Sequence, residues 1–263
     1  MAKNEKTASA KSSAAKEPAG EEPAASSTWF YIAGAVAAVV LIAGAAYWRS
    51  SSADGATGEK KDPDIAELMA PGPLPDIILG KEDAPNTIVE YASMTCPHCA
   101  EFHKVVLPQV QAKYIDTGNA RLILREFPLD RMAAYAFMLA RCAGPDRYYP
   151  MVGALFETQP TWAVPGEDAT NKLLLVAKQA GFSKEKFDQC IGDKELFTKI
   201  VDTRTRANEK FGVDSTPTFF VNGKRMTGEH TLEAFDAALT GKASPPTNPT
   251  GQQPSKPEGP SGQ

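Results

Sequence analysis

The fold is decided by residues 87–99, which read TIVEYASMTCPHC. The segment from Thr87 to Ala92 is mostly β-branched or aromatic and predicts a strand. Behind the cysteines, apolar residues recur at helical spacing, namely Phe102, Val105, Val106 and Val110. The motif Cys96-Pro97-His98-Cys99 is therefore expected at the start of a helix that directly follows a strand.

Further elements extend from this stretch in both directions. Three other runs of strand type are Ile77 to Leu79, Arg121 to Phe127, and Thr218 to Val221. The dipeptide Asn222-Gly223 predicts a tight hairpin turn into Lys224 to Met226. The pattern is helical throughout residues 129–211, and Thr231 caps a last amphipathic helix. The predicted order is βαβ, a helical insertion, then ββα.

The spacing of the two cysteines predicts redox chemistry. At a helix start, Cys96 lies near unpaired backbone N–H groups and the positive end of the helix dipole, which favour its thiolate. Cys99 follows about one turn later on the same side and can close a disulfide with Cys96. His98 can add positive charge or a hydrogen bond and lower the pKa of Cys96 further. A dithiol form stabilised in this way makes the disulfide form an oxidant.

A C-x-x-C motif has two other common uses in proteins. A structural zinc site would need a second such motif or a nearby pair of histidines, and the chain has only His98, His103 and His230. Covalent haem attachment needs C-x-x-C-H, and Ala100 occupies the position of that histidine. We expect neither a metal ion nor a cofactor.

At this point the chain resembles the DsbA family of thiol:disulfide oxidoreductases, whose active site is CPHC on a thioredoxin fold interrupted by a helical domain. The resemblance covers about Leu74 to Gly241. It rests on the CPHC motif at 96–99, on Ser215-Thr216-Pro217-Thr218 before an apolar strand, and on the helical insertion. It implies an α/β, thioredoxin-like fold with an α-helical domain inserted at about 129–211.

An acid lies in the strand that leads to the motif. Glu90 is part of the apolar run Ile88 to Tyr91 and is expected either beneath the helix start or on an exposed face of the strand. The resemblance implies that a buried acid here accepts or relays the proton of the second cysteine, Cys99. Arg125 in the next strand is a candidate neighbour of Glu90.

The dipeptide Thr216-Pro217 opens a predicted strand, where a trans proline is also tolerated. The resemblance implies a cis peptide bond that brings the Thr216 backbone beside Cys96. The backbone there could pair with an extended substrate segment by strand addition, and Thr218 is a candidate for assisting it.

Two more cysteines, Cys142 and Cys190, lie late in predicted helices of the insertion. Two free thiols are unusual in an oxidising compartment, so a structural disulfide is predicted. A second electron-relay pair is the alternative, although neither cysteine has a context that would lower its pKa.

Composition limits the classes of partner. The 263 residues carry 28 Lys and Arg against 32 Asp and Glu, for a formal net charge of -4. No overall basic field exists to neutralise phosphates, so nucleic-acid binding is not expected.

One uncharged segment has the length of a bilayer crossing. Residues 29–48 contain no charged side chain and begin and end with the aromatic residues Trp29 and Trp48. A run this long after a polar leader favours an uncleaved transmembrane helix. The small residues Ala43 to Ala46 keep a cleaved signal as the alternative.

Composition also sets the predicted domain boundaries. Residues 1–28 are expected to be a disordered tail, 49–74 a flexible linker, 75–241 the thioredoxin-like domain, and 242–263 a second disordered tail rich in proline.

We predict a single-pass protein of the bacterial inner membrane, with its domain on the periplasmic side, that donates the Cys96–Cys99 disulfide to unfolded exported proteins with cysteines. The resemblance implies a membrane partner of the DsbB type that reoxidises the pair. The alternatives are a reductase or isomerase of the same fold, serving for example cytochrome maturation, and a thiol metal-binding protein.

Overall fold

The computed structural model describes residues 62–164, 166 and 168–241. The predicted tails and the predicted membrane span 29–48 lie outside these residues. Among the helices that are described, none combines the length and the apolar character needed to cross a membrane.

The sheet that carries the cysteine motif has five strands in the order β1-β3-β2-β4-β5. These strands are β1 (Ile78–Gly80), β2 (Asn86–Ala92), β3 (Ala120–Glu126), β4 (Thr218–Val221) and β5 (Lys224–Arg225). The central pair β2 and β3 is parallel, and every other pairing is antiparallel. The predicted hairpin between β4 and β5 turns through Asn222 and Gly223, which both have positive φ, at 51° and 83°.

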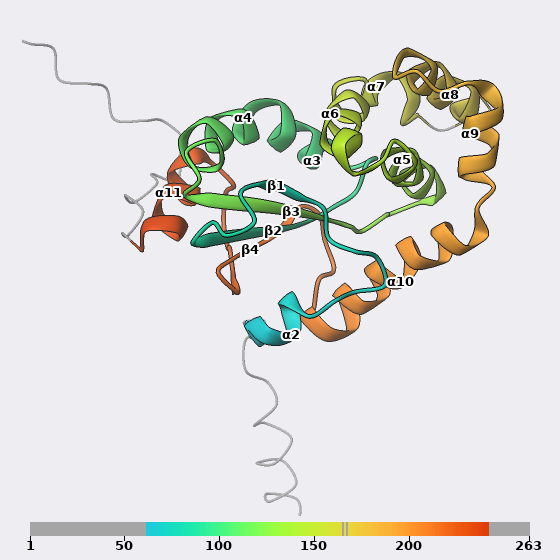
Figure 1. Ribbon diagram of the computed structural model, residues 1–263. Coiled ribbons are helices and arrows are strands. Elements are labelled where there is room, and N and C mark those ends of the chain that lie inside the picture. Colours follow the sequence, from blue (N-terminus) through green and yellow to red (C-terminus); the bar gives the residue numbers. More distant parts are fainter. Residues whose placement is uncertain (1–61, 165, 167, 242–263) are drawn as a thin grey trace, which may run out of the picture. The chain divides into compact units, whose positions relative to one another are not determined.

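Helical segments cover both faces of this sheet. On one face in Figure 1 lie α3 (Pro97–Glu101), α4 (Leu107–Val110) and α11 (Leu232–Thr240). The π-helical segments η1 (Phe102–Val106) and η2 (Gln111–Ile115) continue the chain around α4. On the other face lie α2 (Ile65–Met69) and one end of α10 (Lys194–Phe211).

The two faces follow from the alternation of side chains along the strands. Ile88, Leu122 and Phe219 point into one apolar core, which they share with residues of η1, α4 and α11. Their neighbours in the chain, Val89, Ile123 and Phe220, belong to the opposite core with residues of α2 and α10. The strands β2, β3 and β4 are therefore buried on both sides.

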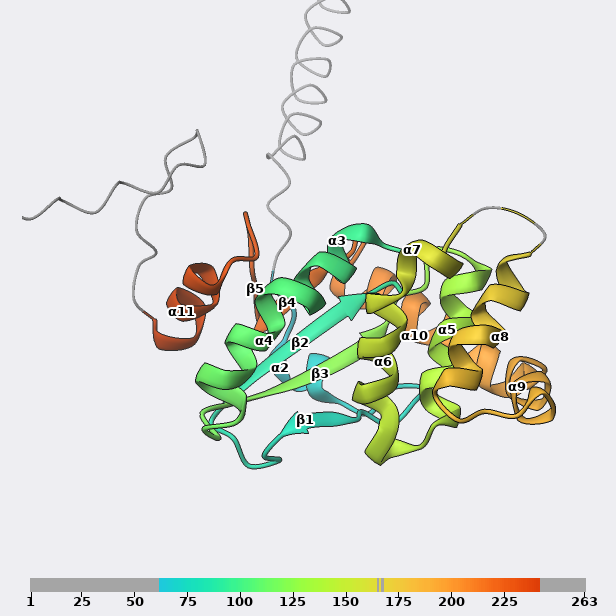
Figure 2. The same cartoon turned by 90° about the horizontal axis from the view of Figure 1, so that it is seen from above.

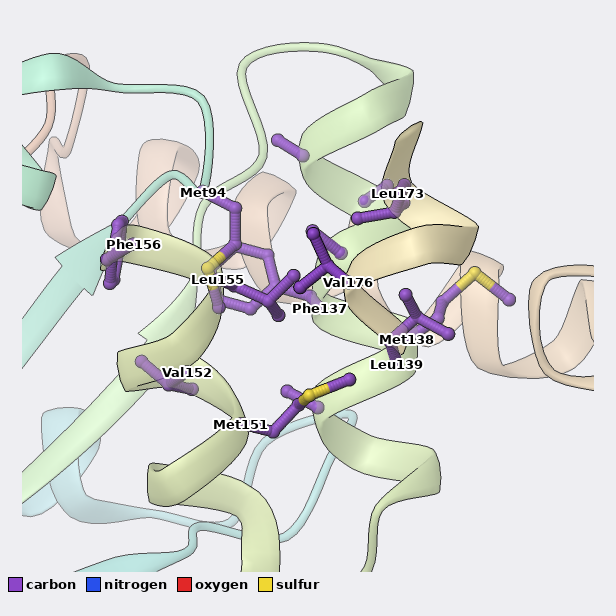
Figure 3. Packing of buried hydrophobic residues seen from close by; sticks show 14 of the residues in the cluster. Met94, Phe137, Met138, Leu139, Met151, Val152, Leu155, Phe156, Leu173 and Val176 are labelled. Carbon is purple, nitrogen blue, oxygen red and sulfur yellow. The ribbon is translucent and has the colours of Figure 1, made fainter. Parts of the chain in front are cut away.

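The insertion lies beside the sheet, as Figures 1 and 2 show. Its helices share an apolar core. Its elements are α5 (Arg131–Cys142), η3 (Pro145–Arg147), α6 (Tyr148–Glu157), α7 (Gln159–Trp162), α8 (Ala169–Gln179), α9 (Lys184–Ile191) and the start of α10. Met94, in the loop before the first cysteine, reaches in among the side chains of α5 and α6 (Figure 3). The core of the insertion therefore extends to the cysteine motif.

Tyr149 of α6 joins the insertion to the sheet. Its hydroxyl lies 2.8 Å from the carbonyl oxygen of Ile77 and 2.9 Å from that of Leu122. It also accepts a hydrogen bond from the backbone N–H of Leu124 at 3.2 Å. A side chain of the insertion thus bonds to backbone groups beside the end of the β1–β3 ladder.

Two predicted boundaries need correction. The flexible linker predicted for 49–74 does not extend to residue 74, because Asp64 caps α2 and Leu68 is fully buried against the sheet. The predicted insertion 129–211 ends too late, because Ala207 and Phe211 of α10 pack in the core of the sheet. Composition alone did not reveal α2, because a single buried leucine leaves no periodic pattern.

Candidate active site

The two cysteines of the motif lie where β2 gives way to α3. The backbone N–H of Cys96 donates to the carbonyl oxygen of Ser93 at 3.0 Å, which closes a turn after the strand. Cys96 is the N-cap residue of α3, and Pro97 is in its first turn. The residue Cys96 is 5% exposed, whereas Cys99 is 0% exposed. Both are free thiols, so the structure represents the dithiol form.

The environment separates the acidities of the two thiols. A hydrogen bond from the Cys99 thiol, the Thr216 side chain and the backbone N–H groups of Cys99 and His98 lower the pKa of Cys96 to about 5, against the effect of burial. Burial raises the pKa of Cys99 far above its usual range, and the charge of Glu90 acts in the same direction. Cys96 is therefore the thiolate at neutral pH, and Cys99 keeps its proton.

The two residues between the cysteines are exposed. His98 contributes to the lowered pKa of Cys96 through its backbone N–H. Its imidazole is open to solvent one residue from the N-terminus of α3. Pro97 occupies a helix position at which a backbone N–H has no partner within the helix, so its lack of a donor costs nothing there.

A second loop lies against Cys96. The Thr216-Pro217 peptide bond is cis, and the Cys96 sulfur lies 3.2 Å from the carbonyl oxygen of Thr216, which accepts a hydrogen bond from it only when the thiol is protonated. Both residues of the dipeptide are half-buried, and the Thr216 side chain helps to lower the pKa of Cys96. Thr218 is buried, and its hydroxyl donates to the Ser215 carbonyl oxygen at 2.8 Å, so it stabilises the loop.

The buried acid has a partner that the sequence analysis did not assign. Glu90 is 0% exposed, and its two carboxylate oxygens lie 2.9 and 3.2 Å from Nε2 of His103. His103 is in η1, four residues after Cys99. This spacing places His103 near Cys99 along the helix, but no sequence signal shows that it meets Glu90, 13 positions away.

Arg125 does not contact Glu90, which corrects the expected pairing. In the parallel ladder Glu90 is opposite Leu124, whereas Arg125 is opposite Tyr91 and points to the other face of the sheet. Arg125 instead forms a two-bond ion pair with Asp76, at 2.9 and 2.8 Å, and donates to the hydroxyl of Tyr91.

Polar residues of the insertion hold the loop before Cys96. The buried side chain of Gln159 donates from Nε2 to the carbonyl oxygens of Met94 and Cys96, at 2.9 Å each. Asp130, the N-cap of α5, accepts a hydrogen bond from the Thr95 hydroxyl at 2.6 Å. Sequence analysis did not assign these contacts, because each joins residues at least 35 positions apart.

Cys142 and Cys190 form a disulfide that joins the C-terminal ends of α5 and α9. It lies within the insertion, and the two active-site thiols take no part in it. Within the part of the chain that the structure describes, no three His, Cys, Asp or Glu side chains gather as metal ligands would.

Known proteins share the fold that carries these residues. The thioredoxin family model matches residues 74–240. The crystal structure of alpha-DsbA1 from Wolbachia pipientis superposes with a TM-score of 0.61 at 34% identity, covering 68% of this chain and 95% of that one. The chain belongs to the DsbA family.

Two curated relatives carry names that describe disulfide chemistry. A protein of Rickettsia felis named as a protein-disulfide oxidoreductase is 31% identical over 185 residues, covering 69% of this chain and 66% of that protein. Disulfide bond formation protein D of Bacillus subtilis is 30% identical over 177 residues, covering 63% of this chain and 78% of that protein. The match to the Rickettsia protein thus spans slightly less than two thirds of its length.

Membership of the DsbA family accounts for the fold that the motif predicted. The thioredoxin-like α/β fold with a helical insertion is confirmed, and so is the resemblance drawn from CPHC and the Thr216-Pro217 dipeptide.

Proposed function

We propose that this protein is a thiol:disulfide oxidoreductase that donates the Cys96–Cys99 disulfide to cysteines of exported proteins. The observation that carries the proposal is the unequal pair of thiols, with the pKa of Cys96 lowered to about 5 and that of the fully buried Cys99 raised. Such a pair stabilises the dithiol form, and a stabilised dithiol makes its disulfide oxidising.

The reaction follows from which sulfur is accessible and which is the better leaving group. A substrate thiolate attacks the Cys96 sulfur, the Cys96–Cys99 bond breaks, and Cys99 leaves with the electron pair and gains a proton. A second substrate thiolate then attacks the substrate sulfur of the mixed disulfide, and Cys96 leaves as a stabilised thiolate. The substrate loses two electrons to form its disulfide, and the cysteine pair gains them.

The cis-proline loop supports the binding of extended segments. The Thr216 carbonyl oxygen, 3.2 Å from the Cys96 sulfur, lies where a substrate backbone would run past the reacting sulfur. Backbone pairing would bring a substrate cysteine to Cys96 with little dependence on its sequence. Thr216 and Pro217 are the proposed contacts.

We also propose that residues 29–48 anchor the domain in the bacterial inner membrane, with the domain on the periplasmic side. The support is the absence of charge over the length of one bilayer crossing, together with a chemistry that needs an oxidising compartment. A membrane oxidase of the DsbB type would regenerate the disulfide. Protease accessibility in spheroplasts tests whether the domain is on the periplasmic side. The N-terminal sequence of the mature protein tests whether residues 29–48 are retained as an anchor. A mature chain that begins near Ala46 would show that the segment is a cleaved signal.

Trapping experiments test the assignment of roles. Cys99→Ala is expected to accumulate mixed disulfides with exported proteins through Cys96, and Cys96→Ala is not. Equal trapping by both variants would contradict the proposal. A redox titration of the Cys96–Cys99 pair against glutathione separates an oxidase from a reductase of the same fold, because the reductase would have a much lower potential.

A further inference from the structure

The buried pair of Glu90 and His103 has no role in the steps above. Glu90 Oε2 lies 2.9 Å from His103 Nε2, and the two side chains are 0% and 3% exposed. The imidazole ring stacks on Phe156 of α6, with centroids 4.3 Å apart, and meets Phe102 edge to face. An acid and an imidazole are thus in contact inside an apolar enclosure, beneath the helix that carries both thiols.

Cys99 is the group with which this pair can exchange a proton. The Cys99 thiol is completely buried, and the charge of Glu90 raises its pKa, which places the two groups within electrostatic reach of each other. His103 is one helical turn beyond Cys99, and it reaches Glu90 from the same stretch of helix. Cys99 therefore has a buried proton donor and acceptor within electrostatic range that solvent does not supply.

The other titratable groups around Glu90 are occupied or form no hydrogen bond to it. Tyr149 of α6 directs its hydroxyl to the carbonyl oxygens of Ile77 and Leu122. His230, before α11, stacks against Phe219, and burial lowers its pKa despite the charge of Glu90. The Cys96 sulfur is bonded to the substrate or the oxidant when Cys99 gains or loses its proton, so it cannot accept that proton. Among the described residues, the groups left to take a proton from Cys99 are Glu90 and His103.

We propose that His103, acting through Glu90, carries the proton that Cys99 gains and loses in each cycle. This inference rests on the proposed function. When a substrate thiolate opens the Cys96–Cys99 bond, the Cys99 sulfur takes the electron pair, and Glu90 passes it the proton held by the pair. On reoxidation, Cys99 returns that proton and attacks the Cys96 sulfur in the mixed disulfide with the oxidant. The oxidant's thiol then leaves with the electron pair.

A partner for Glu90 is needed for physical reasons. An isolated carboxylate in an apolar enclosure is costly and becomes protonated, and it then no longer accepts the proton of Cys99. The imidazole gives the buried carboxylate a hydrogen-bonding partner and offers a second site for the proton. His103 is thus a positioning residue for Glu90 that also stores the proton.

The test follows resolution of the mixed disulfide by Cys99. The dithiol protein is mixed with excess glutathione disulfide, quenched with acid, and analysed by mass spectrometry for the glutathione adduct. In the unchanged protein the adduct is expected to decay quickly, at a rate that varies little from pH 6 to 8. In His103→Leu the decay at pH 7 is expected to be at least about tenfold slower and to rise about tenfold per pH unit, because Cys99 must lose its proton to solvent.

Three further variants distinguish proton transfer by His103 from a purely structural hydrogen bond to Glu90. Gln in His103→Gln can bond Glu90 but cannot carry a proton, so this variant is expected to be slow with the steep pH dependence. Wild-type behaviour of His103→Gln would overturn the proposal. The double variant Glu90→Leu/His103→Leu removes the pair without leaving a buried charge, so it keeps the fold and is also expected to be slow. His230→Gln, a histidine near Glu90 that does not bond it, is the matched control and is expected to behave as the unchanged protein.

The proposed function and this inference fail differently. If the unchanged protein, in its disulfide form, does not oxidise a dithiol peptide, the proposed function is wrong. If it does so, and all the variants resolve the glutathione adduct at the wild-type rate, only the role of His103 is wrong.

Discussion

At the scale of single residues, the site works because two sulfurs one turn apart are held in different surroundings. Cys96 faces donors from α3 and from the Thr216 loop, whereas Cys99 faces the buried carboxylate of Glu90. The helix start thus favours one thiolate, and the sheet beneath it disfavours the other. The difference in acidity comes from position, since both residues are the same amino acid.

The exposed His98 gives the first prediction. Its imidazole lies beside the end of α3 and can favour the Cys96 thiolate while having little effect on the disulfide, so it should change the equilibrium as well as the rate. If it supplies one to two pKa units, His98→Ala is expected to raise the pKa of Cys96 and lower the reduction potential by roughly 30 to 60 mV. Thiolate absorbance against pH and equilibration with glutathione measure the two quantities. An unchanged pKa and potential would assign the activation to the backbone donors and the Thr216 loop alone.

The cysteine pair and Glu90 could be predicted from the sequence, but the partner of Glu90 could not. A motif with fixed spacing, such as CPHC directly after a strand, predicts its local backbone geometry from neighbouring residues alone. Which side chain meets Glu90 depends on the register of β2 against β3, and a shift of one residue exchanges the faces. The observed register places Arg125 on the other face of the sheet and so excludes the expected contact with Glu90. The contact of His103 with Glu90 depends on how the helix packs over the sheet, which the sequence does not specify.

At the scale of elements, the disulfide between α5 and α9 is expected to stabilise the protein without taking part in oxidation. Closing a loop over 48 residues contributes up to about 4 kcal/mol by restricting the unfolded chain. Replacing Cys142 and Cys190 with Ala is expected to lower the urea midpoint of unfolding and to leave the oxidation rate per folded molecule nearly unchanged. Peptide mapping that finds both thiols free in the native protein would refute this role.

The short helix α7 stabilises the loop before Cys96 through the side chain of Gln159. Gln159→Ala removes the donor shared by the Met94 and Cys96 carbonyl oxygens. The Cys96 carbonyl keeps the backbone N–H of Ala100 as a donor, whereas loss of the Gln159 donor to the Met94 carbonyl costs about 1–3 kcal/mol. The variant is expected to lower the free energy of unfolding by that amount and to slow the reaction of Cys96 with glutathione disulfide. Thr161→Ala, an exposed position in the same helix, is the control, and equal effects of the two substitutions would argue against a specific role for Gln159.

The strands could be predicted because alternation, β-branching and turn residues mark them locally. The helical content of the insertion was predictable for the same reason. Its attachment to the loop before Cys96 was not, since Asp130 and Gln159 act across long separations in the chain. Helix α2 was missed because five residues with one buried leucine resemble a linker in composition.

At the scale of the whole molecule, the acidity of Cys96 links stability to pH. An unfolded chain has the ordinary Cys96 pKa of 9.0, whereas the folded dithiol form has a pKa of about 5. Between these values the unfolded state binds more protons, so the free energy of unfolding of the dithiol form is expected to rise from pH 5 to pH 9. This contribution is fully present above pH 9 and is lost as the pH falls through about 5, whereas the raised pKa of Cys99 opposes it above pH 9.

The disulfide form has neither titration, which makes it the reference. Urea unfolding of both forms at several pH values, in the Cys142→Ala/Cys190→Ala background so that reductant acts on the active-site pair alone, gives the difference in unfolding free energy. That difference is expected to grow with pH in favour of the dithiol form. A pH-independent difference would contradict the lowered pKa of Cys96.

The hydrogen bonds of Gln159 also limit how this fold can be rebuilt. A designer who removed the insertion and joined Phe127 directly to α10 would leave the Met94 carbonyl oxygen without the amide that now meets it. A helical domain grafted from a distant relative would have to present an amide donor at the same place before the CPHC loop could keep its shape. Exchange of the helical domain between family members is therefore constrained by the Gln159 side chain. This residue lies far along the chain from the two cysteines that such an experiment would aim to preserve.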